Sequence, residues 1–139
     1  MELRAGPFNG HIEVWGKWAS TPLNLDSQTL LIVEKQRWLR KFDTCGIKSR
    51  EIPLDSFEQP CEFEKLPAEG CNVEFTRIRL PKGQGWFTFG FEAFGSSKTV
   101  ESSLCVVAEL LNERKPPKIT NAFLASYPKW LASLLPAPA

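Results

Sequence analysis

A glycine turn that leads into an aromatic strand constrains this chain more than any other feature. The turn spans residues 81–85, and the strand Trp86–Phe94 follows it directly. Residues 71–80 read as a second strand, so the turn closes a long β-hairpin over residues 71–94. Five of the ten phenylalanines lie in this hairpin. Such a concentration must form the core of a sheet or present a binding face.

The apolar residues of the first hairpin strand change phase along it. Val73 and Phe75 occupy odd positions, whereas Ile78 and Leu80 occupy even ones. If only one face of the sheet is buried, a β-bulge near residues 76–77 would return both sets to that face. We therefore predict a bulge, with the phenylalanines packed in the core against a helix.

The alternative for this hairpin is a regular ladder without a bulge. In that case Arg79 would face Phe87 and Arg77 would face Phe89. Two guanidinium groups over an aromatic surface would make a platform for an anion, a base or a cation–π contact.

Three further elements follow from simple patterns. Alternation over residues 12–16 is typical of a short first strand. Residues 47–54 predict another strand. Residues 99–113 predict a helix, because apolar side chains recur there at helical spacing. This stripe comprises Val100, Leu104, Val107 and Leu111.

Residues 27–42 admit two interpretations. The segment is rich in Glu, Lys, Gln and Arg, which favour helices, and Gly46 is a plausible stop. We therefore predict a helix here. A long strand is the alternative, because apolar side chains also alternate along the segment. These alternating residues are Leu30, Ile32, Trp38 and Phe42.

The C-terminal residues 116–139 form a helical tail after a double proline. Two short helices are expected, the second beginning with Pro128, because proline is tolerated in a first turn but clashes inside a helix. Phe123, Tyr127 and Trp130 belong to an aromatic stripe in this tail. The stripe either covers the open end of the sheet or docks a partner, since aromatic residues dominate protein interfaces.

The length indicates one domain over residues 1–139. The net charge indicates that this domain has no strong overall electrostatic field. The net charge is +1, which does not favour attraction to nucleic acid or to an acidic membrane. Residues 51–70 are acidic and predict a surface excursion. They follow a basic stretch over residues 35–50, and the two are expected to pair across the surface.

Neither a signal core nor an apolar run of membrane-spanning length occurs, so we expect a cytoplasmic protein without a membrane segment. The four cysteines are scattered without a C-x-x-C pair, and we expect them to be small buried hydrophobes instead of metal ligands. They are Cys45, Cys61, Cys71 and Cys105.

Signals for catalysis are weak. His11 is the only histidine, and no serine lies in a nucleophile-elbow pattern. Glu62 and Glu64 would project from one side of a strand over residues 61–66, as paired acid–base carboxylates do. Alternating acids on a solvated strand face give the same pattern. No cofactor or metal is expected.

One local resemblance bears on function. Lys82-Gly83-Gln84-Gly85-Trp86-Phe87-Thr88-Phe89 resembles the RNP1 octapeptide of RNA-recognition motifs, and residues 12–16 are similar to the companion RNP2 strand. A helix before Gly46 and another after the octapeptide also suit that family's order. Trp86 keeps the aromatic type, whereas Gln84 and Glu13 stand at the other two base-stacking positions. The resemblance implies single-stranded RNA binding.

We therefore predict an α+β domain, in which an antiparallel sheet with the 71–94 hairpin is covered on one face by helices. Its predicted function is that of a non-catalytic intracellular interaction or accessory module, with a protein partner or self-association. The first alternative is RNA binding, and the second is a small-ligand enzyme that uses paired carboxylates. The candidate binding residues are Arg77, Arg79, Trp86, Phe123, Tyr127 and Trp130.

Overall fold

The computed structural model describes residues 2–14, 33–61, 66–81, 83, 85–116, 118–119 and 122–134. Its strands are β1 (Glu2–Ala5), β2 (Phe8–His11), β3 (Glu34–Asp43), β4 (Arg50–Ile52), β5 (Gly70–Arg79) and β6 (Gly85–Phe94). Its helices are α1 (Val100–Glu113) and α2 (Tyr127–Leu134). Neither described helix has the length and hydropathy that a membrane span requires.

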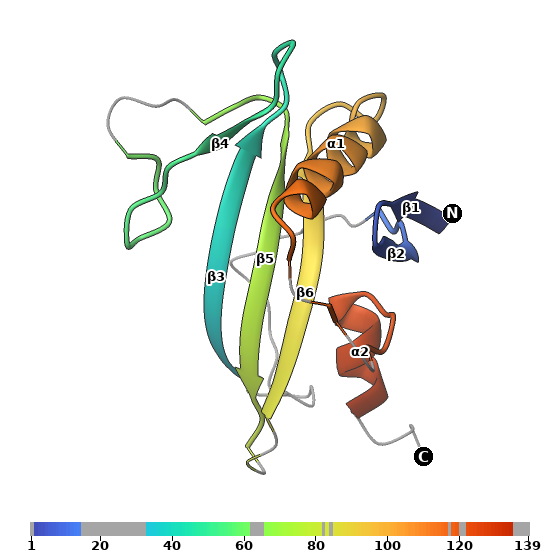
Figure 1. The fold of residues 1–139 in the computed structure, drawn as a ribbon. Helices are drawn as coiled ribbons and strands as arrows, with labels where there is room; N and C mark the ends of the chain where they lie inside the picture. Colours follow the sequence, from blue (N-terminus) through green and yellow to red (C-terminus); the bar gives the residue numbers. More distant parts are fainter. Residues whose placement is uncertain are drawn as a thin grey trace, which may run out of the picture.

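Four strands form one antiparallel sheet in the order β4-β3-β5-β6, and β1 pairs with β2 in a separate ribbon. The three long strands stand side by side, with α1 near one end and α2 near the other (Figure 1). The α+β class and the 71–94 hairpin are confirmed.

The hairpin is a regular ladder, and the predicted bulge is absent. Pairing runs without interruption from Gly70 opposite Phe94 to Arg79 opposite Gly85. Successive side chains of β5 therefore point to alternate faces along its whole length. Arg77 lies opposite Phe87, which shifts the pairing by two residues from the ladder considered above.

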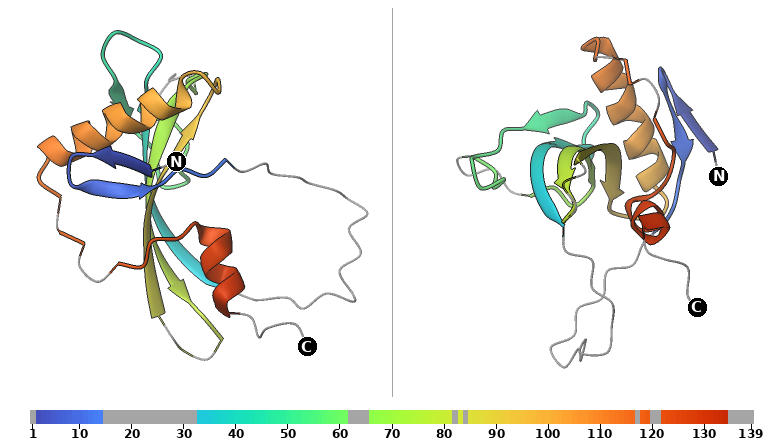
Figure 2. Two further views of the ribbon diagram at one scale, coloured as in Figure 1. Left: turned by 90° about the vertical axis from the view of Figure 1, so that its right-hand side faces the viewer. Right: turned by 90° about the horizontal axis from the view of Figure 1, so that it is seen from below.

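The phase change in β5 arises because the two helices cover opposite faces at opposite ends of the sheet. Cys71 and Val73 face the side covered by α1, where they join the first core. Ile78 and Leu80 face the other side, where α2 covers them. In Figure 2 (left), which looks onto the β6 edge, the connection between the helices passes in front of β6. The expected cover on a single face is therefore wrong.

The first core joins β3, β5 and α1. It consists of Phe42, Cys71, Val73, Val107 and Leu111. Burial raises the pKa of the Cys71 thiol to about 12, so this thiol stays protonated, as its role of small hydrophobe requires. The other cysteines differ from the prediction, because Cys45 is exposed and Cys61 and Cys105 are only partly buried.

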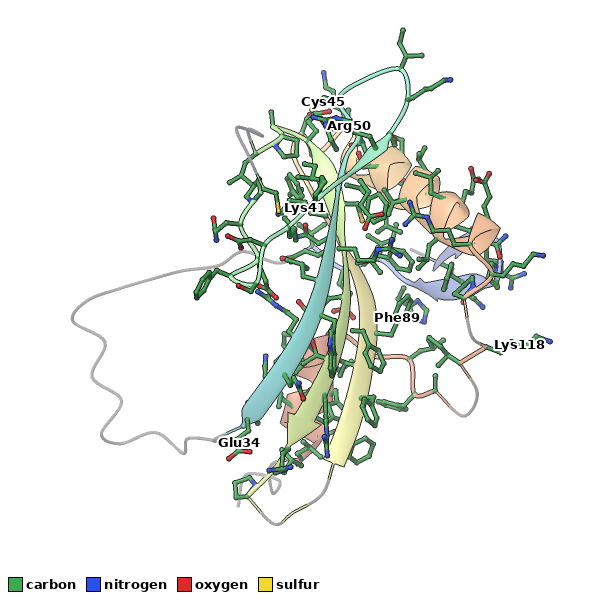
Figure 3. All side chains as sticks on the ribbon, turned by 60° about the vertical axis from the view of Figure 1, so that its left-hand side comes forward. Glu34, Lys41, Cys45, Arg50, Phe89 and Lys118 are labelled. Carbon is green, nitrogen blue, oxygen red and sulfur yellow. The ribbon has the colours of Figure 1, made fainter. Side chains whose placement is uncertain are left out.

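The β1–β2 ribbon extends this core along β6. The Phe8 ring lies 5.6 Å from the Phe89 ring and 5.1 Å from the Phe91 ring, measured between centroids. Phe89 accordingly lies between β6 and the ribbon (Figure 3).

The second core is smaller and depends on α2. Trp130 is buried against Ile78 and Leu80, and Val33, Tyr127, Leu131 and Leu134 surround these three residues. A helix of eight residues is marginal alone, so its packing on the sheet stabilises it.

Several predicted elements need correction. Residues 34–43 form strand β3 instead of a helix, and residues 27–32 lie outside the described residues. The first strands are β1 and β2, which end at residue 11, before the predicted position. The second strand is shorter than predicted, because β4 covers only residues 50–52. Residues 122–126 are not helical, so the first tail helix is wrong. The strand over residues 61–66 falls mostly outside the described residues.

The other predicted elements are confirmed. β5, β6 and α1 lie within a residue or two of their predicted bounds. The second tail helix also forms, since α2 begins one residue before Pro128.

The predicted pairing of acidic and basic segments is confirmed around Glu51. Arg40 donates to both carboxylate oxygens of Glu51, with Nε to Oε1 at 2.6 Å and Nη2 to Oε2 at 2.8 Å. Arg114, just after α1, donates from Nη1 to Oε2 at 2.6 Å. Glu51 thus links β3, β4 and the end of α1. Arg37 likewise pairs with Glu58 of the acidic excursion.

This arrangement predicts a pH dependence. Burial acts to raise the pKa of Glu51, but the hydrogen bonds from Arg40 and Arg114 outweigh it and hold the pKa below its ordinary value of 4.5. A carboxylate with a lowered pKa in the folded state stabilises the protein at neutral pH, and this contribution is lost as the pH falls through that lowered pKa. We expect Glu51→Gln to lower the Tm at pH 7 and the deficit to shrink below pH 4.5.

Thermal melts of both proteins over this pH range test the prediction. Glu34→Gln is the matched control, because Glu34 is exposed and, among the described residues, pairs with Arg79 alone, at 3.4 Å. Its Tm should follow that of the wild type. A deficit for Glu51→Gln that is constant with pH would contradict the assigned role.

Candidate functional site: an aromatic row on the open half of the sheet

Beyond the part covered by α1, the same face of the sheet carries three exposed aromatic side chains. They are Trp38 on β3, Phe75 on β5 and Phe87 on β6, and we call them the aromatic row. Their exposed fractions are 48%, 41% and 64%. Large aromatic side chains gathered on a surface in this way are typical of binding sites.

The register of the sheet places the three rings in contact. Trp38 lies directly opposite Phe75, and their ring centroids are 5.6 Å apart. Phe87 lies diagonally across from Phe75, with centroids 5.4 Å apart and ring planes inclined by only 11°. Contacts of this kind between neighbouring strands fix the rings relative to one another.

This geometry limits what the row presents to a ligand. Offset stacking of Phe75 on Phe87 uses part of one face of each ring, and the tilted Trp38 ring lies on the other side of Phe75. Ring edges, which carry partial positive charge, therefore form much of the outer surface. The row is better described as a firm apolar ridge than as a set of free ring faces.

Two arginines flank the row on its own face. Arg77 lies between Gln36 and Phe87 in the ladder and is exposed. It forms no ion pair with another residue in the described part of the chain. Arg79, two residues further along β5, makes the exposed contact with Glu34. The end of the sheet nearest the hairpin turn is thus positively charged beside the rings.

A hollow adjoins the row at the outer side of β3. Its volume is about 400 Å³, and residues 37–39 and 54–58 line it. The ion pair between Arg37 and Glu58 holds the 54–58 turn against β3. Phe57 projects from this turn with 81% of its surface exposed. The hollow widens the candidate contact surface beyond Trp38.

The structure divides the predicted binding residues among three places. Arg77 and Arg79 lie beside the aromatic row. Trp86 points to the opposite face, where its ring is 5.6 Å from that of Trp130. Tyr127 and Trp130 belong to the second core, so they act in packing.

Phe123 lies apart from both groups. It is exposed in the connection between the helices, with 70% of its surface accessible. Trp86 lies on the opposite face of the hairpin from Arg77 and Arg79, so these three candidate binding residues do not share one surface.

Trp38 was missed as a site residue because its segment was predicted as a helix. The signal that could have found it was the alternation of Trp38 with other apolar residues, which suited the strand interpretation. Once residues 34–43 are placed in a strand next to β5, Trp38 and Phe75 share a face.

The candidates for chemistry gain no support from the geometry. His11 is exposed at the end of β2, and Glu62 and Glu64 lie outside the described residues. Within the ranges that the structure describes, no three His, Cys, Asp or Glu side chains form a group that could hold a metal ion.

Comparison with family models, with curated proteins and with solved structures finds no match to this chain.

Proposed function

We propose that this protein is a non-catalytic interaction or accessory module of the cytoplasm that binds a protein partner through the aromatic row. The observation that carries the proposal is the contact of three half-exposed rings from three neighbouring strands. Rigid aromatic side chains bury a large area at low entropic cost, which is why they dominate the energetics of protein interfaces. A cytoplasmic location suits the four free thiols.

The geometry favours a protein over single-stranded RNA. Stacking of bases requires free ring faces, whereas Phe75 already stacks on Phe87. Trp86, the aromatic residue that the RNP1 resemblance retains, packs against Trp130 on the other face. The helix that the resemblance placed before Gly46 is strand β3. Arg77 and Arg79 then serve to attract carboxylates on a partner that is apolar at its centre.

Affinity capture of partners from an extract of the source organism tests this proposal, if the wild type is compared with variants in which a residue of the aromatic row is substituted. The wild-type protein and Phe75→Ala are compared, with Phe123→Ala as the matched control, because Phe123 is an exposed phenylalanine outside the row. We expect one set of proteins to be retained by the wild type and by Phe123→Ala and lost from Phe75→Ala. Circular dichroism establishes that each variant is folded.

Nuclease treatment of the extract separates the alternatives. Capture that survives nuclease but requires Phe75 supports a protein partner. Capture that nuclease abolishes would replace the proposal by RNA binding. Capture that Phe123→Ala abolishes, but Phe75→Ala does not, would move the site to the tail.

A further inference from the structure

The outer edge of β6 lacks the usual protection of an edge strand. β6 is ten residues long and, within the described residues, pairs only with β5. Residues 85–91 contain neither a charged residue nor a proline, and the ladder with β5 contains no bulge. Native proteins normally block such an edge with one of these features, because unpaired backbone groups readily pair with another strand.

The part of this edge that remains open is the part nearest the hairpin turn. Towards the other end of β6, Phe8 packs over Phe89 and Phe91. In Figure 2 (left) the β1–β2 ribbon passes in front of the far half of β6, and the connection that leads into α2 crosses nearer the middle of the strand. At the end near the turn, α2 packs on one face through Trp86 and Trp130, but no described segment pairs with the strand edge there. The open edge includes Gly85–Thr88, which carries Phe87 of the aromatic row.

We propose that a second copy of this chain adds its β6 to this open edge in antiparallel orientation. The two four-stranded sheets would then continue as one sheet of eight strands. This inference goes beyond the proposed function, because it concerns the strand edge and the backbone instead of the ring-bearing face.

Charge and symmetry favour a second copy as the occupant. Two identical strands bring the same short segment together, so any charge near the two-fold axis would meet its own kind. Residues 85–91 carry no charge, and this cost is therefore absent. A two-fold axis perpendicular to the sheet also keeps each face on its own side, so the two aromatic rows lie on the same face.

One register joins the rows directly. With the axis at Phe87, this residue lies opposite Phe87 of the second copy, and Gly85 lies opposite its Phe89. Directly opposed side chains approach to about 5 Å between Cβ atoms, which is contact distance for two phenyl rings. The rows then form one continuous ridge across both copies.

Trp38 provides the matched control for this proposal. It belongs to the same row, but it lies on β3, two strands and about 10 Å from the β6 edge. Phe87→Lys would place a positive charge on the edge strand, directly opposite the same charge on the second copy. Trp38→Lys leaves the edge strand unchanged. Both side chains are about half exposed or more, so both variants should fold.

Light scattering and sedimentation velocity over a range of concentrations test the inference. We expect the wild type to approach twice the 15.7 kDa of one chain as the concentration rises. Phe87→Lys should stay at half that mass, and Trp38→Lys should dimerise as the wild type does. A monomeric wild type, a dimeric Phe87→Lys, or a monomeric Trp38→Lys would each overturn the pairing through β6.

The test of dimerisation through β6 can be distinguished from the test of partner binding by the aromatic row. Trp38→Lys removes one ring of the row but keeps the edge, so it should dimerise while it loses the foreign partner. Loss of the partner with an intact dimer therefore supports both proposals. Retention of the partner by both Trp38→Lys and Phe75→Ala would refute the role of the row without affecting the dimer.

Discussion

Replacement of Phe42 by alanine is expected to lower the free energy of unfolding by about 3–5 kcal/mol. The Phe42 side chain is fully buried, and β3 brings it between β4 and β5 under α1. It packs in the first core with Val107 and Leu111 of the helix. Its removal would leave a cavity where three strands and a helix meet, and a rigid ladder on both sides of β3 limits collapse into that space.

Urea unfolding measures this effect through the midpoint and the slope of the transition. Phe57→Ala is the control, because Phe57 projects into solvent from the 54–58 turn. Its free energy of unfolding should stay within about 0.5 kcal/mol of the wild type. Since single domains are commonly stable by about 5–15 kcal/mol, Phe42→Ala should remain folded with a small margin. A loss below about 1 kcal/mol would show that the first core does not hold the domain together.

Replacement of Trp130 by alanine should release α2 from the sheet at a cost of about 3 kcal/mol in the stability of that region. Trp130 is the buried residue of α2, and it contacts both Ile78 and Leu80. Without it, an eight-residue helix has too little burial to persist, because short helices are marginal in water. We expect local unfolding of α2 while β5, β6 and α1 stay folded.

Hydrogen exchange resolved by residue tests this prediction. Amides of residues 129–134 should lose protection in Trp130→Ala, and amides of α1 should keep it. Phe123→Ala, in the same C-terminal region but exposed, should leave both helices protected. Equal loss of protection in α1 and α2 would instead mean that the two cores unfold as one unit.

The elements that could be predicted from the sequence are those with a strong local pattern. β5, β6 and α1 have clear periodicity and clear turn or helix-stop residues at their ends. β3 could not be identified in this way. Its side chains up to Trp38 are all exposed, and their composition favours a helix. Pairing with β4 and β5 on both sides outweighs that preference, and no local pattern reports such pairing.

The candidate site was predictable only in part, for a related reason. The position of Arg77 and Arg79 beside an aromatic surface follows from the regular ladder, which was the alternative to the predicted bulge. The rest depends on which face of the sheet is covered at each end, and no local pattern in the sequence reports this. The assumption that all apolar residues share one face led to the prediction of a bulge. In the structure, one face is buried at the α1 end of the sheet and the opposite face is buried at the α2 end.

β5 is buried on one face beside α1 and on the opposite face beside α2. The strand should therefore tolerate insertions or deletions poorly at its middle, where the buried face changes. Between Val73 and Thr76 the interior passes from one side of the sheet to the other. A single inserted residue at this crossing would turn every later side chain of the strand over. Ile78 and Leu80 would then join the side of α1, and α2 would face arginines. Evolution can therefore vary the loops of this protein far more freely than the length of this strand.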